Sequence, residues 1–488
     1  MKTIVPPRLS LAVPLILMLA ACAATPPEGP VKVALPASYA QAQSGWEPAQ
    51  ALAAAPRGAW WSVFDDPVLA GLEAQVAQHN QSLAAQLAAY EQAQAAVAQA
   101  QAAYYPTLTA GASATRSKFA SSSTSVAFPG VIRNSLSTSA TASWEPDLWG
   151  KVRLQVQAGQ ATAAASAATL ANTQLSLQST LATSYLQLRT VDAQIVLAHN
   201  TVAAYQRALQ LTDNRYKAGV DTAADVAQAR TQLLQAQTSL TDLGVTRVQL
   251  QNAIAVLVGK PPAEFSLPAS DTLPEVPAIP AGIPAQLLQR RPDLAAAQAQ
   301  VQAANAQIGV AQTAWFPNLT LSAQGGSQAA RIAELFSAPS LFWSIGPQLA
   351  ATLFDGGLRR AQVQSSQAAY RQTVANYRQS VLTALQQVED NLAAQRILTQ
   401  EAQQQAEVVQ AAEVSLRLAE NQYKAGTAPY LNVITAQTTA TSARNAQLTL
   451  LNRRYAASVG LIQSLGGGWG AADTPAIGPL PAASAIAR

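Results

Sequence analysis

The chain has 488 residues, of which 49% are hydrophobic and only 11% are charged. This length exceeds that of a usual single domain, and alanine interleaved with glutamine, as over 84–103, favours long, closely packed helices over a bulky globular core. A formal net charge of +4 gives no reason to expect a nucleic-acid partner. The single cysteine excludes an internal disulfide framework.

The N-terminus has the pattern of an export signal. The basic residues Lys2 and Arg8 precede an apolar stretch over 9–19, which is too short to span a membrane as a helix. The stretch ends in Leu19-Ala20-Ala21-Cys22, which resembles the bacterial lipobox, where the cysteine is lipidated and becomes the first residue. We expect a signal peptide over 1–21, a lipid anchor, including palmitate, on Cys22, and a lipidated extension over 22–65; a chance cysteine beside an ordinary cleavage site is the alternative.

The chain contains an internal repeat with an offset near 210 residues. Tyr104-Tyr105-Pro106 recurs as Trp315-Phe316-Pro317, and Asn214 to Gly219 recurs as Asn421 to Gly426. The first repeat is expected over 66–258, with helices near 66–103, 150–217 and 223–258; the second is expected over 284–465, with helices near 284–314, 357–424 and 429–465. A proline-rich linker over 259–283, forming an equatorial region, separates the repeats, and an irregular tail over 466–488 follows them.

The longest predicted helices carry a coiled-coil pattern. From Leu177 to Tyr216, mostly apolar residues recur at an alternating spacing of four and three. A helix over 151–216 would extend roughly 100 Å at about 1.5 Å per residue. A soluble coiled-coil spacer would share this pattern. The pattern therefore predicts a rod but does not decide whether the rod belongs to a soluble spacer or to a membrane protein.

Between the helices the hydrophobic period changes to two, which is typical of strands. Strands are expected near 107–117, 134–145, 318–326 and 343–354, each with an apolar face and a face of small polar residues. Their lengths suit tilted strands that span a bilayer, and aromatic residues such as Trp144 and Trp149 lie at the helical ends, as in an interfacial girdle. A soluble pair of hairpins is the alternative.

Four strands leave two open edges, which hydrocarbon does not tolerate. Two copies would give eight strands and an interior filled by side chains, whereas three would give twelve strands and room for an aqueous lumen. We therefore expect a mainly α fold with a small membrane β-barrel: a homotrimer whose 12-strand β-barrel continues into a tunnel of twelve helices.

Several motifs resemble the TolC-like outer-membrane efflux proteins, in their nodulation-protein-T-like lipoprotein branch. These motifs are Trp60-Trp61, Asp66-Pro67, Arg290-Arg291-Pro292-Asp293-Leu294, Ala304 to Gly309, Trp315-Phe316-Pro317 and Leu465 to Trp469. The resemblance covers nearly the whole mature chain. It implies a trimeric exit duct whose 12-strand β-barrel in the outer membrane is continuous with a 12-helix periplasmic α-barrel. It also implies a periplasmic adaptor and an inner-membrane efflux transporter as partners.

A duct requires a gate rather than catalytic groups. His79 and His199 neighbour neither a cysteine nor a carboxylate cluster, so no catalytic site, metal site or cofactor is expected. The gate is expected at the predicted helical turns, and the turns also resemble the family's adaptor-docking tips. The predicted gate residues are Asp225, Leu431, Asn432 and Thr435; the predicted docking residues are Tyr216, Lys217, Gly219, Tyr423, Lys424 and Gly426. The alternative is that the two glycines serve turn geometry alone.

The second turn departs from the best-known pattern of that family. Asn432 and Thr435 occupy the positions that align with acidic residues, and Ala428 stands where an arginine is common, whereas Asp225 retains the first-half acid. A constriction of this composition should be less cation-selective than one lined by acidic residues at those positions.

Two other classes of function compete with the export duct. A lipid-anchored structural coiled coil that bridges the envelope layers would keep the helical seams but would not need amphipathic strands. A secreted enzyme has no supporting constellation of residues.

Overall fold

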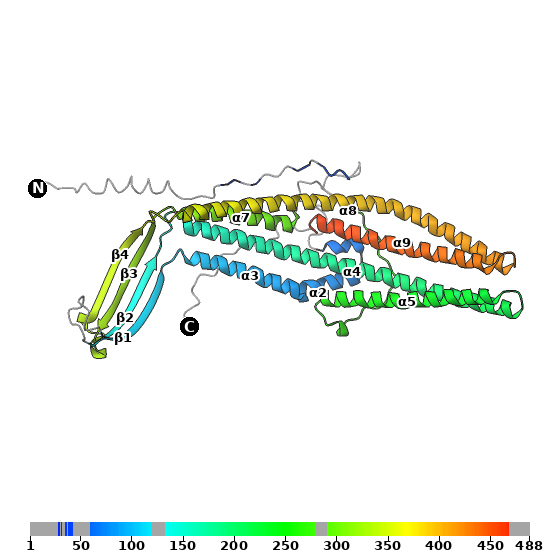
Figure 1. Cartoon of the computed structure of the whole chain (residues 1–488), viewed down its shortest axis with the longest axis horizontal. Coiled ribbons are helices and arrows are strands. Elements are labelled where there is room, and N and C mark those ends of the chain that lie inside the picture. Colours follow the sequence, from blue (N-terminus) through cyan, green and yellow to red (C-terminus); the bar gives the residue numbers. More distant parts are fainter. Residues whose placement is uncertain are drawn as a thin grey trace.

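The computed structural model describes residues 28–29, 31, 35–36, 38–41, 59–118, 132–279 and 290–467. The expected signal peptide over 1–21, the lipidation site Cys22 and the tail from residue 468 onward lie outside the described residues. The described chain forms an elongated rod of helices with a four-stranded sheet at one end and two helical hairpin turns at the other (Figure 1).

Two long helices run the length of the rod. α4 (Lys151–Lys217) and α8 (Leu358–Lys424) have 67 residues each, which corresponds to roughly 100 Å. Shorter helices lie end to end beside each long helix (Figure 1): α3 (Gln81–Ala102) and α5 (Ala223–Leu257) beside α4, and α7 (Pro292–Thr313) and α9 (Tyr430–Ser464) beside α8. The same arrangement therefore occurs once in each half of the chain.

The expectation of one continuous helix over 66–103 is wrong. The structure has α2 (Pro67–His79) and α3, separated at the buried residue Asn80. The Asn80 carboxamide oxygen accepts a hydrogen bond from the Leu83 amide (3.0 Å), while its Nδ2 donates to the Leu257 carbonyl (2.8 Å). One side chain thus caps the start of α3 and the end of α5, which satisfies backbone groups of both helices and compensates for the break.

The sheet is antiparallel and its strands follow chain order, so β1 and β4 are its edges. The strands are β1 (Thr107–Lys118), β2 (Ile132–Trp144), β3 (Asn318–Ala329) and β4 (Leu341–Ala350). The last strand ends before its predicted limit of 354. The Asp355 carboxylate accepts hydrogen bonds from the Gly357 amide (3.0 Å) and the Arg359 amide (3.2 Å), so the chain is already turning into α8 there.

The register confirms that one face of the sheet is apolar and the other polar. Directly opposite residues share a face: Leu108 faces Ala142, and Ala323 faces Ile345, whereas Gln324 faces Ser344. On the apolar face, side chains such as Trp343 (79% exposed) and Ile345 (75% exposed) have no covering layer within the described chain. An exposed apolar face of this size marks a surface that contacts lipid or protein.

The main core lies near the middle of the rod. There α2, the end of α9 and the start of α7 pack against α4 and α8, and Leu69, Tyr185 and Tyr455 are fully or almost fully buried. Arg291, from the sequence motif 290–294, is 7% exposed; its guanidinium donates to the Ser464 carbonyl (3.1 Å) and the Gln387 side chain (2.9 Å). This motif therefore joins the start of α7 to α8 and to the C-terminal end of α9.

A buried ion network holds the linker between the repeats. Asp192 (2% exposed) pairs with Arg189 (3.2 Å) and with Arg247 (2.7 Å). The two guanidinium groups also donate to linker carbonyls, Arg189 to Pro268 (3.0 Å) and Arg247 to Leu267 (2.9 Å). Because each buried charge has a charged partner and further hydrogen bonds, the network fixes the path of a segment that has little regular structure.

Candidate functional site

Each hairpin turn at the far end of the rod is built around a glycine. Gly219 and Gly426 have φ values of +77° and +74°, a conformation that ends a helix at little cost only for glycine. Thr222 caps α5, and the Asp225 carboxylate accepts hydrogen bonds from the Thr222 amide (3.0 Å) and hydroxyl (2.7 Å). The predicted gate residue Asp225 is therefore part of a helix cap.

A three-residue cluster joins the two hairpins. The Tyr423 hydroxyl, on α8, donates to the Asp221 carboxylate (2.7 Å), in the turn after α4. Asp221 also pairs with Arg215 (3.0 Å), and the Arg215 guanidinium lies over the Tyr423 ring, 4.7 Å from its centroid. A cation, a carboxylate and a phenol thus connect residues that are about 200 positions apart in the chain.

The electrostatics of this cluster favour its charged form. Burial acts to raise the pKa of Asp221, but hydrogen bonds from Arg215 and Tyr423 prevail and hold it below its ordinary value. For Tyr423, burial is the main reason that the pKa of the phenol is raised, and its hydrogen bond to Asp221 adds to the effect. At neutral pH Asp221 is therefore a carboxylate that accepts a hydrogen bond from the neutral phenol of Tyr423.

Apolar packing surrounds the cluster. Tyr423 is 3% exposed, and its ring lies 5.3 Å from the ring of the equally buried Tyr430. Val433 and Ile434 of α9 complete the contact with Ala229 of α5. The hairpins are thus held together by a small core as well as by the polar link.

The structure separates the predicted docking residues into two groups. Tyr423 is inside the cluster and not at the surface of the chain, whereas Tyr216 is 47% exposed and Lys217 pairs with Asp213 (2.6 Å) at the surface. Gly219, Lys424 and Gly426 are also exposed.

The remaining predicted gate residues lie together on α9. Leu431, Asn432 and Thr435 are exposed, opposite the side that buries Val433 and Ile434. The Thr435 hydroxyl donates to the Leu431 carbonyl (3.0 Å) of its own helix. These three side chains face away from the hairpin core and are available to line an opening or an interface.

Two residues of the cluster, Arg215 and Asp221, were not among the predicted sites. The sequence did contain a signal, because these opposite charges flank Gly219, whereas the second turn has Gln422 and Ala428 at the corresponding positions. What the sequence did not show was that the pair would reach Tyr423 of the other hairpin.

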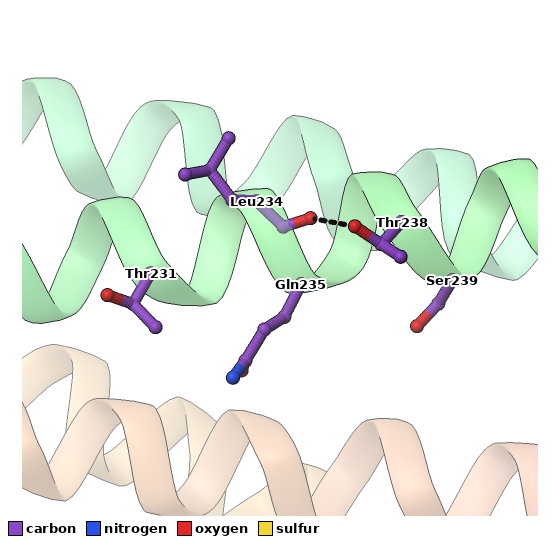
Figure 2. A pocket seen from close by; sticks show the side chains of 5 residues that line it. All are labelled: Thr231, Leu234, Gln235, Thr238 and Ser239. Carbon is purple, nitrogen blue, oxygen red and sulfur yellow. Dashed lines mark hydrogen bonds between the residues drawn. The ribbon is translucent and has the colours of Figure 1, made fainter.

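A groove runs between the hairpins above this cluster. α4 packs on α9, whereas α5 makes few contacts with α9, so a hollow of about 190 Å³ remains between the three helices. Figure 2 shows Thr231, Gln235 and Ser239 of α5, with Gln235 directed towards the helices of the second hairpin. Thr438 and Ser442 of α9 line the opposite wall.

The described residues contain no group of three histidine, cysteine, aspartate or glutamate side chains placed to hold a metal ion. Among the helices that the structure describes, none is both long enough and apolar enough to cross a membrane.

The outer membrane efflux protein family model matches two successive stretches of the chain, 72–260 and 283–467. The probable efflux pump outer membrane protein TtgC of Pseudomonas putida is 31% identical over 449 residues, which are 91% of this chain and 91% of that protein. The pyoverdine export outer membrane protein OpmQ of Pseudomonas aeruginosa is 32% identical over 459 residues, 93% of this chain and 95% of that one.

Solved structures share the fold. The Neisseria gonorrhoeae MtrE outer membrane channel in its open state superposes with a TM-score of 0.78 at 27% identity, covering 90% of this chain and 97% of that one. The Campylobacter jejuni CmeC outer membrane channel, at 21% identity, shows the same fold alone, with a TM-score of 0.85 and coverage of 93% and 96%. The family consists of transport components rather than enzymes. With both halves of the chain matched, this protein belongs to the outer membrane efflux protein family.

Proposed function

We propose that three copies of this chain form the outer-membrane exit duct of a tripartite efflux pump, which conducts small molecules passively to the exterior. The observation that carries the proposal is the sheet: it has two unpaired edge strands, an exposed apolar face and a polar face, and it continues into helices of roughly 100 Å. In a membrane, the edges β1 and β4 require partners, and copies of the same chain supply them.

Three copies give twelve strands, enough for an aqueous lumen lined by the polar face. The apolar face then contacts lipid, and the helices of the three copies continue the lumen through the periplasm. A lipid anchor on Cys22 supplements this attachment, since a single anchor binds a membrane only modestly.

The gate is proposed at the hairpin turns. The exposed side chains of Leu431, Asn432 and Thr435 line the constriction, with Asp225 near it, while the link from Tyr423 to Asp221 holds the two hairpins of each copy in the closed arrangement. Opening then requires these hairpins to separate, which breaks the hydrogen bond from Tyr423 to Asp221 and the contact of the Arg215 guanidinium with the Tyr423 ring.

The periplasmic adaptor is proposed to dock at the outer surface of the tips, contacting Tyr216, Lys217, Gly219, Lys424 and Gly426. The groove between α5 and α9 extends this surface, because its walls of threonine, serine and glutamine can hydrogen-bond a helix laid along it. The inner-membrane transporter is the further partner, and no cofactor is needed.

Removal of the lipid anchor tests the duct against a lipid-anchored coiled-coil spacer. Cys22→Ala should abolish lipidation yet leave trimer in the outer-membrane fraction, because the sheet supplies most of the apolar contact with lipid. The measurement is membrane fractionation followed by native electrophoresis. Complete release of the variant as soluble protein would support the spacer and refute the duct.

A further inference from the structure

The charged residues of the sheet are gathered at one end. Across β1, β2, β3, β4 and the segment that joins β3 to β4, the charged residues are Arg116, Lys118, Arg133, Arg331 and Glu334. All lie at the end of the sheet remote from the helices. The residues between β1 and β2, 119–131, include no charged residue in the sequence. This end of the sheet is therefore basic.

The register divides these bases between the two faces. Arg116 lies opposite Asn134 and Lys118 opposite Ile132, and both share the apolar face with Leu108. Arg133 lies opposite Ser117 and so belongs to the polar face. Two cationic side chains are thus placed on the apolar, lipid-facing side of the edge strand β1.

The distance of Arg116 and Lys118 from the helical end of β1 matches the thickness of the apolar part of a bilayer. Arg116 lies nine positions beyond Thr107, which is at the helical end of β1. At about 3.4 Å per residue and a tilt of about 40°, this is roughly 23 Å along a barrel axis, close to the apolar band of about 25 Å in outer-membrane barrels. Arg116 and Lys118 therefore lie where hydrocarbon gives way to headgroups.

Neither base is neutralised within the chain that the structure describes. Glu334, the acid at this end of the sheet, pairs with Arg331 (3.5 Å), and no described carboxylate lies within ion-pair distance of Arg116 or Lys118. Both side chains are exposed. A cationic pair directly beyond an apolar band is complementary to a lipid that carries an anionic headgroup above its acyl chains.

We propose that Arg116 and Lys118 form a binding site for phosphorylated glycolipid of the outer leaflet, with the headgroup phosphates on the two cations and the acyl chains along the apolar face of β1. The proposal rests on the barrel put forward above, because only a membrane-inserted sheet presents this face to lipid. The site anchors the edge strand, where adjacent copies meet.

The experiment uses the purified full-length protein in detergent and purified bis-phosphorylated lipid A as the probe. The parent is first tested for native trimers and for channels in planar bilayers. Failure of the parent in both tests overturns the duct and this site together. A parent that forms channels but binds bis-phosphorylated lipid A no better than fully dephosphorylated lipid A overturns this site alone.

Variants then locate the site. We expect the double variant Arg116→Gln/Lys118→Gln to weaken binding of lipid A about ten-fold or more, and either single variant to weaken it less. Arg133→Gln removes a charge at the same height from the opposite face, so it should retain the affinity of the parent. Unchanged binding in the double variant, or an equal loss in Arg133→Gln, would refute the assignment.

A competition measurement identifies the source of the phosphate. Inorganic phosphate in large excess should displace little of the bound lipid A, because the acyl chains contribute through the apolar face. Complete displacement would show a site for free anions instead of lipid. Added sodium chloride should weaken lipid binding to the parent more than to the double variant.

Discussion

At the scale of single residues, Glu73 is a carboxyl group in an apolar setting. It is 0% exposed in the core around α2, and neither of its oxygens has a hydrogen-bonding partner in the described part of the chain. Burial raises its pKa from 4.5 to about 9. In the unfolded chain the carboxyl ionises near its ordinary value, so between these two pH values the folded state binds more protons and the free energy of unfolding falls as pH rises.

Glu73→Gln should therefore raise the free energy of unfolding at pH 8, on the order of 1 to 3 kcal/mol. Near pH 5 it should have little effect, because the free-energy cost of keeping the Glu73 carboxyl protonated in the folded state is small there. Thermal unfolding at the two pH values measures the difference. Glu91→Gln, on the exposed face of α3, is the matched control and should change stability equally at both. A Glu73→Gln variant no more stable than the parent at pH 8 would contradict the buried, protonated state.

At the scale of elements, the strand register makes opposite predictions for adjacent residues of β2. Ala140 lies opposite Ala110 and Gly325 on the apolar face, while Ser139 lies opposite Gly111 and Gly326 on the polar face. Ala140→Arg should cost about 2 to 4 kcal/mol per copy near the bilayer midplane, and Ser139→Arg should cost far less. Trimer yield after refolding into lipid vesicles reports the difference. Equal yields would show that the apolar face does not lie against lipid, and a lower yield for Ser139→Arg would show that the faces are assigned the wrong way round.

At the scale of the whole molecule, the link between hairpins should control opening. Asp221→Asn removes the charge that pairs with Arg215 and weakens the acceptor for Tyr423, so we expect a larger single-channel conductance in planar bilayers. Because the pKa of Asp221 is held below its ordinary value, the link from Tyr423 to Asp221 is fully formed when the pH is above the ordinary pKa of an aspartate. It should be lost only in acid, as pH falls through the lowered pKa.

Asp213→Asn is the control for this prediction. Asp213 pairs with Lys217 one turn along the same helix (2.6 Å), so its loss removes an ion pair from the tip without disconnecting the two hairpins. Its conductance should match that of the parent. If Asp213→Asn and Asp221→Asn open the channel equally, general loosening of the tip and not the link between hairpins governs the gate.

Local patterns were sufficient for the long helices and for the strands. The four-three spacing over 177–216 and the period of two in β1 and β2 are both written in consecutive residues, which is enough to predict a long helix and the strands. The internal repeat allowed the same reasoning to be applied to the second half of the chain. These features depend on neighbours within a few positions.

The sequence by itself thus determined the internal repeat, the long helices and the alternating faces of the sheet. Only the tertiary structure decided the break at Asn80, the early end of β4 and the joining of Asp221 to Tyr423. Each of these depends on groups from segments that are distant in the chain or on a cap that competes with the pattern: the Leu257 carbonyl at Asn80, the Asp355 cap after β4, and the second hairpin at Asp221. The contacts of Asn80 and Asp221 form when folding brings distant segments together, and the Asp355 cap depends on local hydrogen bonds that a hydrophobic period does not record. The periodicity of a single element therefore encodes none of them.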